Sequence, residues 1–315
     1  MAAQTVQTEQ RGRVLTVRLD NPPRNFMNGR MVGELGALVR RLESDRSVGA
    51  VVITGAPEDV FITHYDVREI VGGAGALSAT FSPGQAASGL RAVGAARKVP
   101  GLRNAVAHTP AAGVSALLEI HEVFTRMNRL DKVVIAAING LATGGGCELA
   151  LACDLRYMAE GQGRIGQPEI VLGIIPGGGG TQRLTRAIGT ARALELMLEG
   201  TLLAATEARD AGLVHRVVPA ERLLAEAQAT GERLARRTPE TIGALKRAVY
   251  EGGSETLGAG LHVERAGFLS TASTPAARMA MERYAQDVER SGSAAISDPD
   301  AYRPWQDGTA VDMTT

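Results

Sequence analysis

Three short apolar runs separated by other patterns constrain the fold of this chain most strongly. They are VLTVRL at residues 14–19, AVVIT at 50–54 and VVIAAI at 133–138. The second and third runs are continuously apolar, which is typical of strands buried on both faces of a sheet. Between the first two runs, apolar residues recur at helical spacing from Met31 to Leu42. Because strand, helix and strand follow one another, we expect an α/β fold with a parallel sheet.

Beyond residue 190 the sequence predicts mainly helices, at 191–198, 206–211, 221–236, 239–250 and 255–270, with a strand at 213–218. Thr206 is the expected N-cap of the second of these helices, and Gly212 the expected stop. Residues 71–116 are rich in Gly, Ala, Ser and Pro, and predict a long excursion with loose helical pieces. The polar stretch from Ser291 predicts a tail.

Charge and cysteine content narrow the expected surroundings and partners. The 34 basic and 34 acidic residues give a formal net charge of zero, so charge supplies no basis for binding nucleic acid. Two cysteines, Cys147 and Cys153, exclude a disulfide framework and indicate a reducing compartment. No apolar run reaches the ~18 residues of a membrane span, and residues 1–10 lack a secretory signal. We expect a cytoplasmic protein, with neither nucleic acid nor membrane as a partner.

A glycine run, Gly144 to Gly146, precedes a helix-forming segment that contains Glu148. Glycines at a helix start let the backbone approach a ligand, and the free N–H groups there favour negative charge. If a thioester carbonyl docked at this point, the run would form an oxyanion hole, worth ~3–4 kcal/mol per donor. Glu148 would lie beside it. The alternative is a tight strand–helix turn with a surface glutamate.

A second carboxylate, Glu169, ends the segment GQPE. Pro168 fixes the backbone before it, and the apolar run from Ile170 to Leu172 indicates partial burial. Burial raises the pKa of a carboxyl group and makes it a candidate proton donor. Glu148 and Glu169 facing one water can divide the work of activating that water and protonating a carbon. Their spacing alone does not establish the pair. The histidines stand at no metal-ligand spacing, so no metal is expected.

Several segments together resemble the enoyl-CoA hydratase/isomerase (crotonase) family. They are NGLATGGGCELALACD, IGQPEIVLGIIPGGGGTQRLTRAIG and AGLVHRVVP, with DNPPRNFMN and AVVITGAPEDVF nearer the N-terminus. The resemblance covers residues 14–71 and 117–250. It implies an α/β crotonase-like spiral of ββα repeats over residues 1–205, in which 72–115 form a long variable excursion. It also implies a C-terminal helical trimerisation region over 206–290, followed by the polar tail at 291–315, and hence a homotrimer or hexamer.

The resemblance further implies an acyl-CoA substrate, with coenzyme A as part of that substrate and no separate cofactor. Glu148 and Glu169 match the two catalytic glutamates of the family. Gly145 matches the oxyanion-hole donor at the helix, and Tyr65 stands where the second backbone N–H is expected. Four more residues match positions that bind substrate or coenzyme A: Asp66, Arg68, Gly144 and Gly146.

The segment FITHYDVRE departs from the family pattern, because His64 replaces a glycine and Tyr65 a small residue. Any residue except proline supplies a backbone N–H, so an oxyanion hole survives if these side chains point elsewhere. The leading interpretation is hydration of a 2-enoyl-CoA in fatty-acid or related acyl-CoA metabolism. Double-bond isomerisation, or another reaction through a CoA enolate, is the alternative within the family. A catalytically silent acyl-CoA-binding protein is the second, supported by the altered loop.

Overall fold

The computed structural model describes residues 4–75, 80–99, 101–106 and 108–313. A six-stranded sheet has the order β1-β2-β3-β5-β7-β10, with β1 (Val6–Arg11), β2 (Val14–Leu19), β3 (Ala50–Gly55), β5 (Val133–Ile138), β7 (Leu155–Ala159) and β10 (Arg216–Val218). A four-stranded sheet has the order β4-β6-β8-β9, with β4 (Val60–Ile62), β6 (Leu141–Thr143), β8 (Arg164–Gly166) and β9 (Leu202–Ala204).

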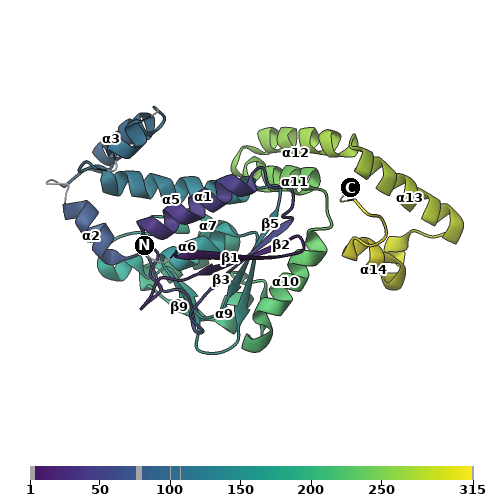
Figure 1. The fold of residues 1–315 in the computed structure, drawn as a ribbon, viewed down its shortest axis with the longest axis horizontal. Coiled ribbons are helices and arrows are strands. Elements are labelled where there is room, and N and C mark those ends of the chain that lie inside the picture. The colour runs from purple at the N-terminus through teal and green to yellow at the C-terminus, as the bar shows by residue number, and fades with distance from the viewer. Residues whose placement is uncertain (1–3, 76–79, 100, 107, 314–315) are drawn as a thin grey trace.

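The chain alternates between the two sheets in a repeating pattern (Figure 1). Strands β3, β5 and β7 each lead directly into a short strand of the second sheet, and a helix follows. The strands β2, β3, β5, β7 and β10 pair in parallel, which confirms the predicted parallel sheet. β1 was not predicted. It pairs antiparallel at the edge of the sheet and is almost wholly exposed, so its polar sequence carries no burial pattern.

Three helices bury side chains in the main core, together with residues of the large sheet: α1 (Gly29–Leu42), α5 (Ala112–Arg129) and α6 (Gly145–Ala152). The predicted apolar stripe of α1 is buried, and the Asn28 side chain caps its first turn by accepting a hydrogen bond from Met31 N. Each large aliphatic side chain buried here contributes roughly 1.5–3 kcal/mol. All eight residues of α6 are buried, so the helix that carries Glu148 has little freedom to move.

The predicted excursion is largely helical in the part that the structure describes. It contains α2 (Val67–Gly75), α3 (Pro83–Arg97) and α4 (Leu102–Val106), and α3 projects from the body of the molecule (Figure 1). None of the described residues of α3 is buried, so arginine contacts hold this part of the excursion to α5. Arg97 donates to the Ser115 carbonyl, and Arg103 donates to Glu119. Residues 76–79, 100 and 107 of the expected excursion lie outside the described residues.

The helices predicted beyond residue 190 are present as α8 (Thr190–Glu199), α9 (Ala205–Asp210), α10 (Leu223–Leu234), α11 (Pro239–Tyr250) and α12 (Leu257–Ala272). The C-terminal part also contains α7 (Gly180–Ile188), α13 (Pro275–Ser291) and α14 (Pro299–Asp307). The prediction that Thr206 caps α9 is wrong. The N-cap is Ala204, whose backbone N–H donates to the Glu207 side chain, so α9 begins one residue before Thr206. Gly212 adopts the left-handed φ of +81° that a helix stop requires.

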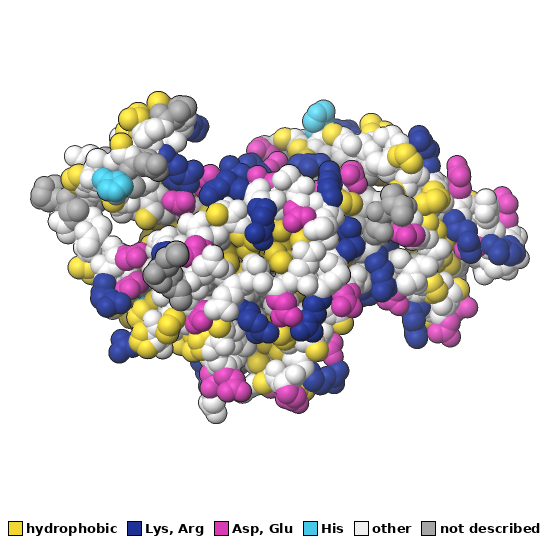
Figure 2. All heavy atoms as spheres, in the orientation of Figure 1, with side chains coloured by type: hydrophobic (Ala, Val, Ile, Leu, Met, Phe, Trp, Pro, Cys, Tyr) yellow, Lys and Arg dark blue, Asp and Glu magenta, His cyan; other side chains and the backbone are white. Residues whose placement is uncertain are grey.

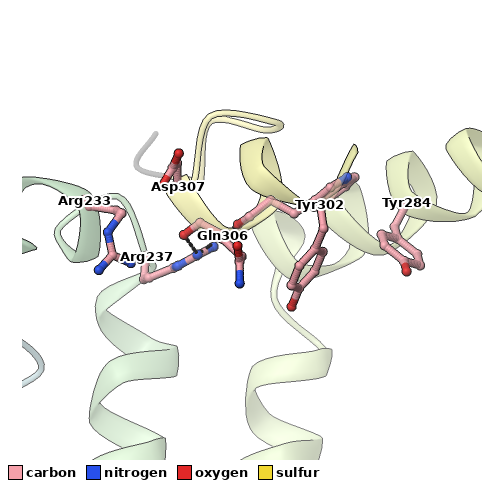
Figure 3. Close-up of a pocket in the computed structure, with 7 residues that line it drawn as sticks. Arg233, Arg237, Tyr284, Tyr302, Gln306 and Asp307 are labelled. Carbon is pink, nitrogen blue, oxygen red and sulfur yellow. Dashed lines mark hydrogen bonds between the residues drawn. The ribbon is translucent and has the colours of Figure 1, made fainter. Parts of the chain in front are cut away.

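The segment expected to be a polar tail folds back through α14 (Figure 1), and residues that meet there are drawn in Figure 3. Arg237 donates to the backbone carbonyls of Trp305 and Gln306, at the C-terminal end of this helix. Trp305 packs edge-on against Tyr284 of α13, with 5.1 Å between ring centroids. A cavity of about 740 Å³ lies between α10, α13 and α14. These contacts are hydrogen bonds from an arginine side chain to backbone carbonyls and one aromatic pair, neither of which appears as an apolar pattern in the sequence. On the face drawn in Figure 2, acidic and basic side chains are interspersed.

Candidate active site

Glu148 lies in the first turn of α6 and is only 4% exposed. Its Oε1 accepts hydrogen bonds from the backbone N–H groups of Gly178, at 2.6 Å, and Gly180, at 2.9 Å. Burial raises the pKa of Glu148, while these two bonds and the charge of Arg183 oppose the rise. A Cβ atom at Gly178 would lie 2.4 Å from Oε2 of Glu148, so only glycine allows the loop to approach this closely.

Glu169 begins the short 3-10 helix η1 (Glu169–Leu172) and is partly buried, as its apolar flank predicted. Its Oε1 would lie 3.0 Å from a Cβ atom at Gly144, the residue that caps α6 with a left-handed φ of +50°. Burial raises the pKa of Glu169 to about 7, its own backbone N–H opposes this, and the charge of Glu148 adds to the rise. Both carboxylates therefore lie at the glycine-lined start of one helix.

The backbones of Tyr65 and Gly145 adjoin each other beside these carboxylates. A Cβ atom at Gly145 would lie 3.3 Å from Tyr65 N. On either side of Tyr65, Met27 N donates to His64 O and Asp66 N donates to Met27 O. Tyr65 N itself has no hydrogen-bond acceptor among the described residues. Gly145 is the first residue of α6, so its N–H precedes the first intrahelical hydrogen bond. Two neighbouring backbone donors form an arrangement suited to a negatively charged oxygen.

The side chains of the altered loop have partners of their own. The Tyr65 hydroxyl donates to Glu69 Oε2 at 2.8 Å, and the same oxygen accepts from Gly29 N at the start of α1. Burial and the bond to Glu69 raise the pKa of Tyr65. The His64 ring stacks on Phe26, with 4.5 Å between centroids. The side chains of His64 and Tyr65 are thus accommodated against α1 and the segment that precedes it. The backbone of Tyr65 lies beside Gly145.

The residues expected to bind substrate or coenzyme A occupy different environments. Arg68 is 85% exposed in its side chain and forms an ion pair of 2.9 Å with Asp66. Asp66 also accepts from Arg68 N, which fixes the first turn of α2. Gly146 packs against β4, where a Cβ atom would lie 2.4 Å from the Ile62 carbonyl oxygen, whereas Gly144 lies against Glu169. Of the two outer glycines, Gly144 is therefore the one beside the carboxylates.

Gln167 is a site residue that the sequence reasoning missed. It is 1% exposed, and with its amide nitrogen turned toward Glu169 it donates to both carboxylate oxygens, at 3.0 and 3.1 Å. Such donation favours the charged form of Glu169 and so opposes the rise in its pKa that burial causes. Its place in GQPE, two residues before the glutamate, was visible in the sequence. The direction of its side chain was not, because it depends on the packing of Gly180 against the amide.

The described residues form neither a cluster suited to a metal ion nor a helix that could span a membrane. None of them group at least three His, Cys, Asp or Glu side chains in a way that would hold a metal ion. None of the helices formed by these residues combines the length and apolar character needed to cross a membrane. Cys147 and Cys153 are buried and unpaired.

Comparison with known proteins shows where this arrangement belongs. A family model described as enoyl-CoA hydratase/isomerase matches residues 9–95 and 103–291. The chain belongs to this family. It is 35% identical over 283 residues to a probable mitochondrial enoyl-CoA hydratase of Dictyostelium discoideum, covering 90% of this chain and 88% of that protein. It is also 35% identical to a probable enoyl-CoA hydratase of Rhizobium meliloti, covering 94% and 96%.

A solved family structure confirms the predicted α/β crotonase fold. The enoyl-CoA hydratase of Bacillus anthracis superimposes with a TM-score of 0.71 at 28% identity, covering 92% of this chain and 98% of that one. The alternation of strands between two sheets, followed by helices, is therefore the predicted spiral of ββα repeats.

The titration of Glu169 provides a test of the site's electrostatics. We expect its carboxyl carbon to titrate with a midpoint near pH 7 in a ¹³C NMR experiment, and Glu148→Gln to lower that midpoint by removing a neighbouring negative charge. Because this pKa exceeds the value of 4.5 that is usual for a glutamate, the folded state binds more protons than the unfolded state between pH 4.5 and about 7. The group's contribution to stability therefore declines as the pH rises through that range. A midpoint near 4.5 would show that the carboxylate is solvated.

Proposed function

We propose that the protein catalyses reversible addition of water to a 2-enoyl-CoA thioester, with Glu148 and Glu169 as its acid/base pair. The observation that carries the proposal is the presence of both carboxylates at the glycine-lined start of α6. Hydration requires that one water lose a proton and that the α-carbon gain one, so two carboxyl groups match the chemistry. The relatives named as enoyl-CoA hydratases support the same activity.

In this proposal the thioester oxygen accepts hydrogen bonds from the N–H groups of Tyr65 and Gly145. Both donors are already fixed in place, so they stabilise the enolate oxygen as charge develops, by roughly 3–4 kcal/mol each. Tyr65 acts through its backbone only, since its hydroxyl is engaged by Glu69. The exposed guanidinium of Arg68 is suited to a phosphate of coenzyme A. Asp66 holds that arginine at the start of α2.

The two glutamates have environments that suit different steps. Glu148 has Oε1 occupied by two backbone donors, while Oε2 has no hydrogen-bond donor among the described residues and is the atom that orients the water. Glu169, with its pKa raised to about 7, exchanges a proton near neutral pH and delivers it to the α-carbon. Gln167 holds both oxygens of Glu169 from the buried side.

The same observations weigh against the two rival functions. Double-bond isomerisation needs one carboxyl group to move a proton between two carbons. It gives no reason to bury Glu148, whose desolvation is costly. The silent acyl-CoA binder was favoured by the altered loop at His64 and Tyr65. Since both side chains pack against other partners, that loop retains a usable backbone donor.

A homotrimer or hexamer is also part of the proposal. Several large apolar side chains on η1, α8 and the segment between η1 and α7 are exposed in the single chain: Val171, Leu172, Ile175, Leu194 and Leu198. A second set lies on α11 and α12, within the predicted trimerisation region: Leu245, Val249, Leu257, Phe268 and Leu269. Apolar surface of this extent is typical of subunit interfaces. A cytoplasmic location and the absence of a separate cofactor complete the proposal.

The activity is tested by mixing purified protein with trans-2-enoyl-CoAs of increasing chain length and following loss of the conjugated thioester absorbance. We expect hydration by the wild type, and a fall in kcat of about 100-fold or more in both Glu148→Gln and Glu169→Gln, because each removes a proton-transfer group. Glu160→Gln, at an exposed glutamate, is the matched control and keeps full activity. Binding of CoA esters without hydration at any chain length would support the silent binder instead.

The assembly is tested by the mass of the protein in solution. Three or six times the 33.0 kDa of one chain is the expected result. We further expect Val171→Asp together with Leu198→Asp to lower the mass to that of one chain, since charges would enter an apolar interface. A single-chain mass for the wild type at micromolar concentration would contradict the proposed trimer.

A further inference from the structure

The loop at residues 177–180, which donates hydrogen bonds to Glu148, has no side chains that could fix its own position. Residues Gly177 to Gly180 are four consecutive glycines, which have the greatest backbone freedom of any residue type. Side chains are excluded where the loop approaches its neighbours most closely. A Cβ atom would lie 2.4 Å from Glu148 Oε2 at Gly178, and 2.6 Å from the side-chain amide of Gln167 at Gly180. The position of this loop, and of the donors it offers to Glu148, must therefore be fixed from outside.

Helix α5 supplies that support through His121. The Nε2 atom of His121 lies 2.7 Å from the carbonyl oxygen of Gly177. A carbonyl oxygen only accepts, so the ring nitrogen is the donor and carries the hydrogen. Leu117 and Ile120, on the same helix, also adjoin the loop. Their methyl groups are 3.4 and 3.2 Å from the positions of Cβ atoms at Gly177 and Gly178.

The Gly177 carbonyl and the Gly178 N–H belong to one peptide group. That group is planar, so its C=O and N–H directions are fixed relative to each other and rotate together. His121 binds the oxygen end, and the nitrogen end donates to Glu148 Oε1 at 2.6 Å. A hydrogen bond at the carbonyl also polarises the N–H and strengthens the bond it donates. A single peptide group therefore connects the hydrogen bond of His121 to the hydrogen bond that Glu148 accepts.

We infer that His121 is a positioning residue for Glu148, acting through the Gly177–Gly178 peptide group. It lies on the exposed face of α5, and its contact is with the loop and not with the carboxylates. Its part in catalysis rests on the proposed hydratase function. The structural relay itself does not, because it is a property of the loop.

The test compares three variants. His121→Leu removes the donor, His121→Gln restores an amide donor at similar reach, and Thr125→Ala changes a neighbour one turn along the same surface of α5. We expect His121→Leu to lower kcat for enoyl-CoA hydration about three- to tenfold with KM within twofold of wild type. We expect His121→Gln to recover most of the loss and Thr125→Ala to show none. Such a split and rescue would not result from general destabilisation.

A second measurement makes the relay testable without activity. The Gly178 amide proton, observed by ¹⁵N–¹H NMR, should move upfield in His121→Leu and stay near its wild-type position in His121→Gln and Thr125→Ala. If the wild type hydrates no enoyl-CoA, the proposed function fails, and the Gly178 shift alone decides the relay. An unchanged Gly178 shift in His121→Leu would overturn the inference. So would a loss of kcat that His121→Gln does not recover.

Discussion

The close approach of glycine backbones to two carboxylates is the constraint on which the rest of the site depends. Glu148 is nearly buried, and a buried carboxylate needs donors in place of water. Gly178 and Gly180 provide them at 2.6 and 2.9 Å, at distances that leave no room for a side chain. Gly144 creates the corresponding space beside Glu169. A side chain at Gly178 or Gly144 would press directly on a carboxylate, whereas one at Gly180 would clash with Gln167.

As a consequence, the two carboxyl groups have different environments, and different groups set their pKa values. Glu148 combines a burial that raises its pKa with two donors and a nearby arginine that oppose the rise. For Glu169, its own backbone N–H opposes the effect of burial, the charge of Glu148 adds to it, and the pKa rises to about 7. Unequal environments for two neighbouring carboxyl groups allow one to orient a water while the other exchanges a proton. In the proposed mechanism, the Tyr65 and Gly145 backbones complete the site, because they offer N–H donors that do not change position when charge develops.

Sequence patterns predicted the elements of the core well, because buried helices and strands have regularly spaced or continuous apolar residues. The bounds of β2 and α11 are those expected, and α1 differs by two residues at its start. β1 and α14 show no such pattern, since neither an exposed edge strand nor a helix whose backbone carbonyls accept from an arginine side chain requires regularly spaced apolar residues. In the site, the family motifs brought attention to Glu148 and Glu169. The roles of Gln167 and His121 depend on contacts between segments that are distant in sequence, and on side-chain directions that spacing does not specify.

The most direct test of this account is a crystal structure of the protein with a 3-hydroxyacyl-CoA, the product of the proposed hydration. The account predicts that the thioester oxygen lies within about 3.2 Å of both Tyr65 N and Gly145 N. It also predicts that the product hydroxyl lies within hydrogen-bonding distance of Glu148 and Glu169. A thioester bound away from these two N–H groups, or a hydroxyl in contact with neither glutamate, would contradict it.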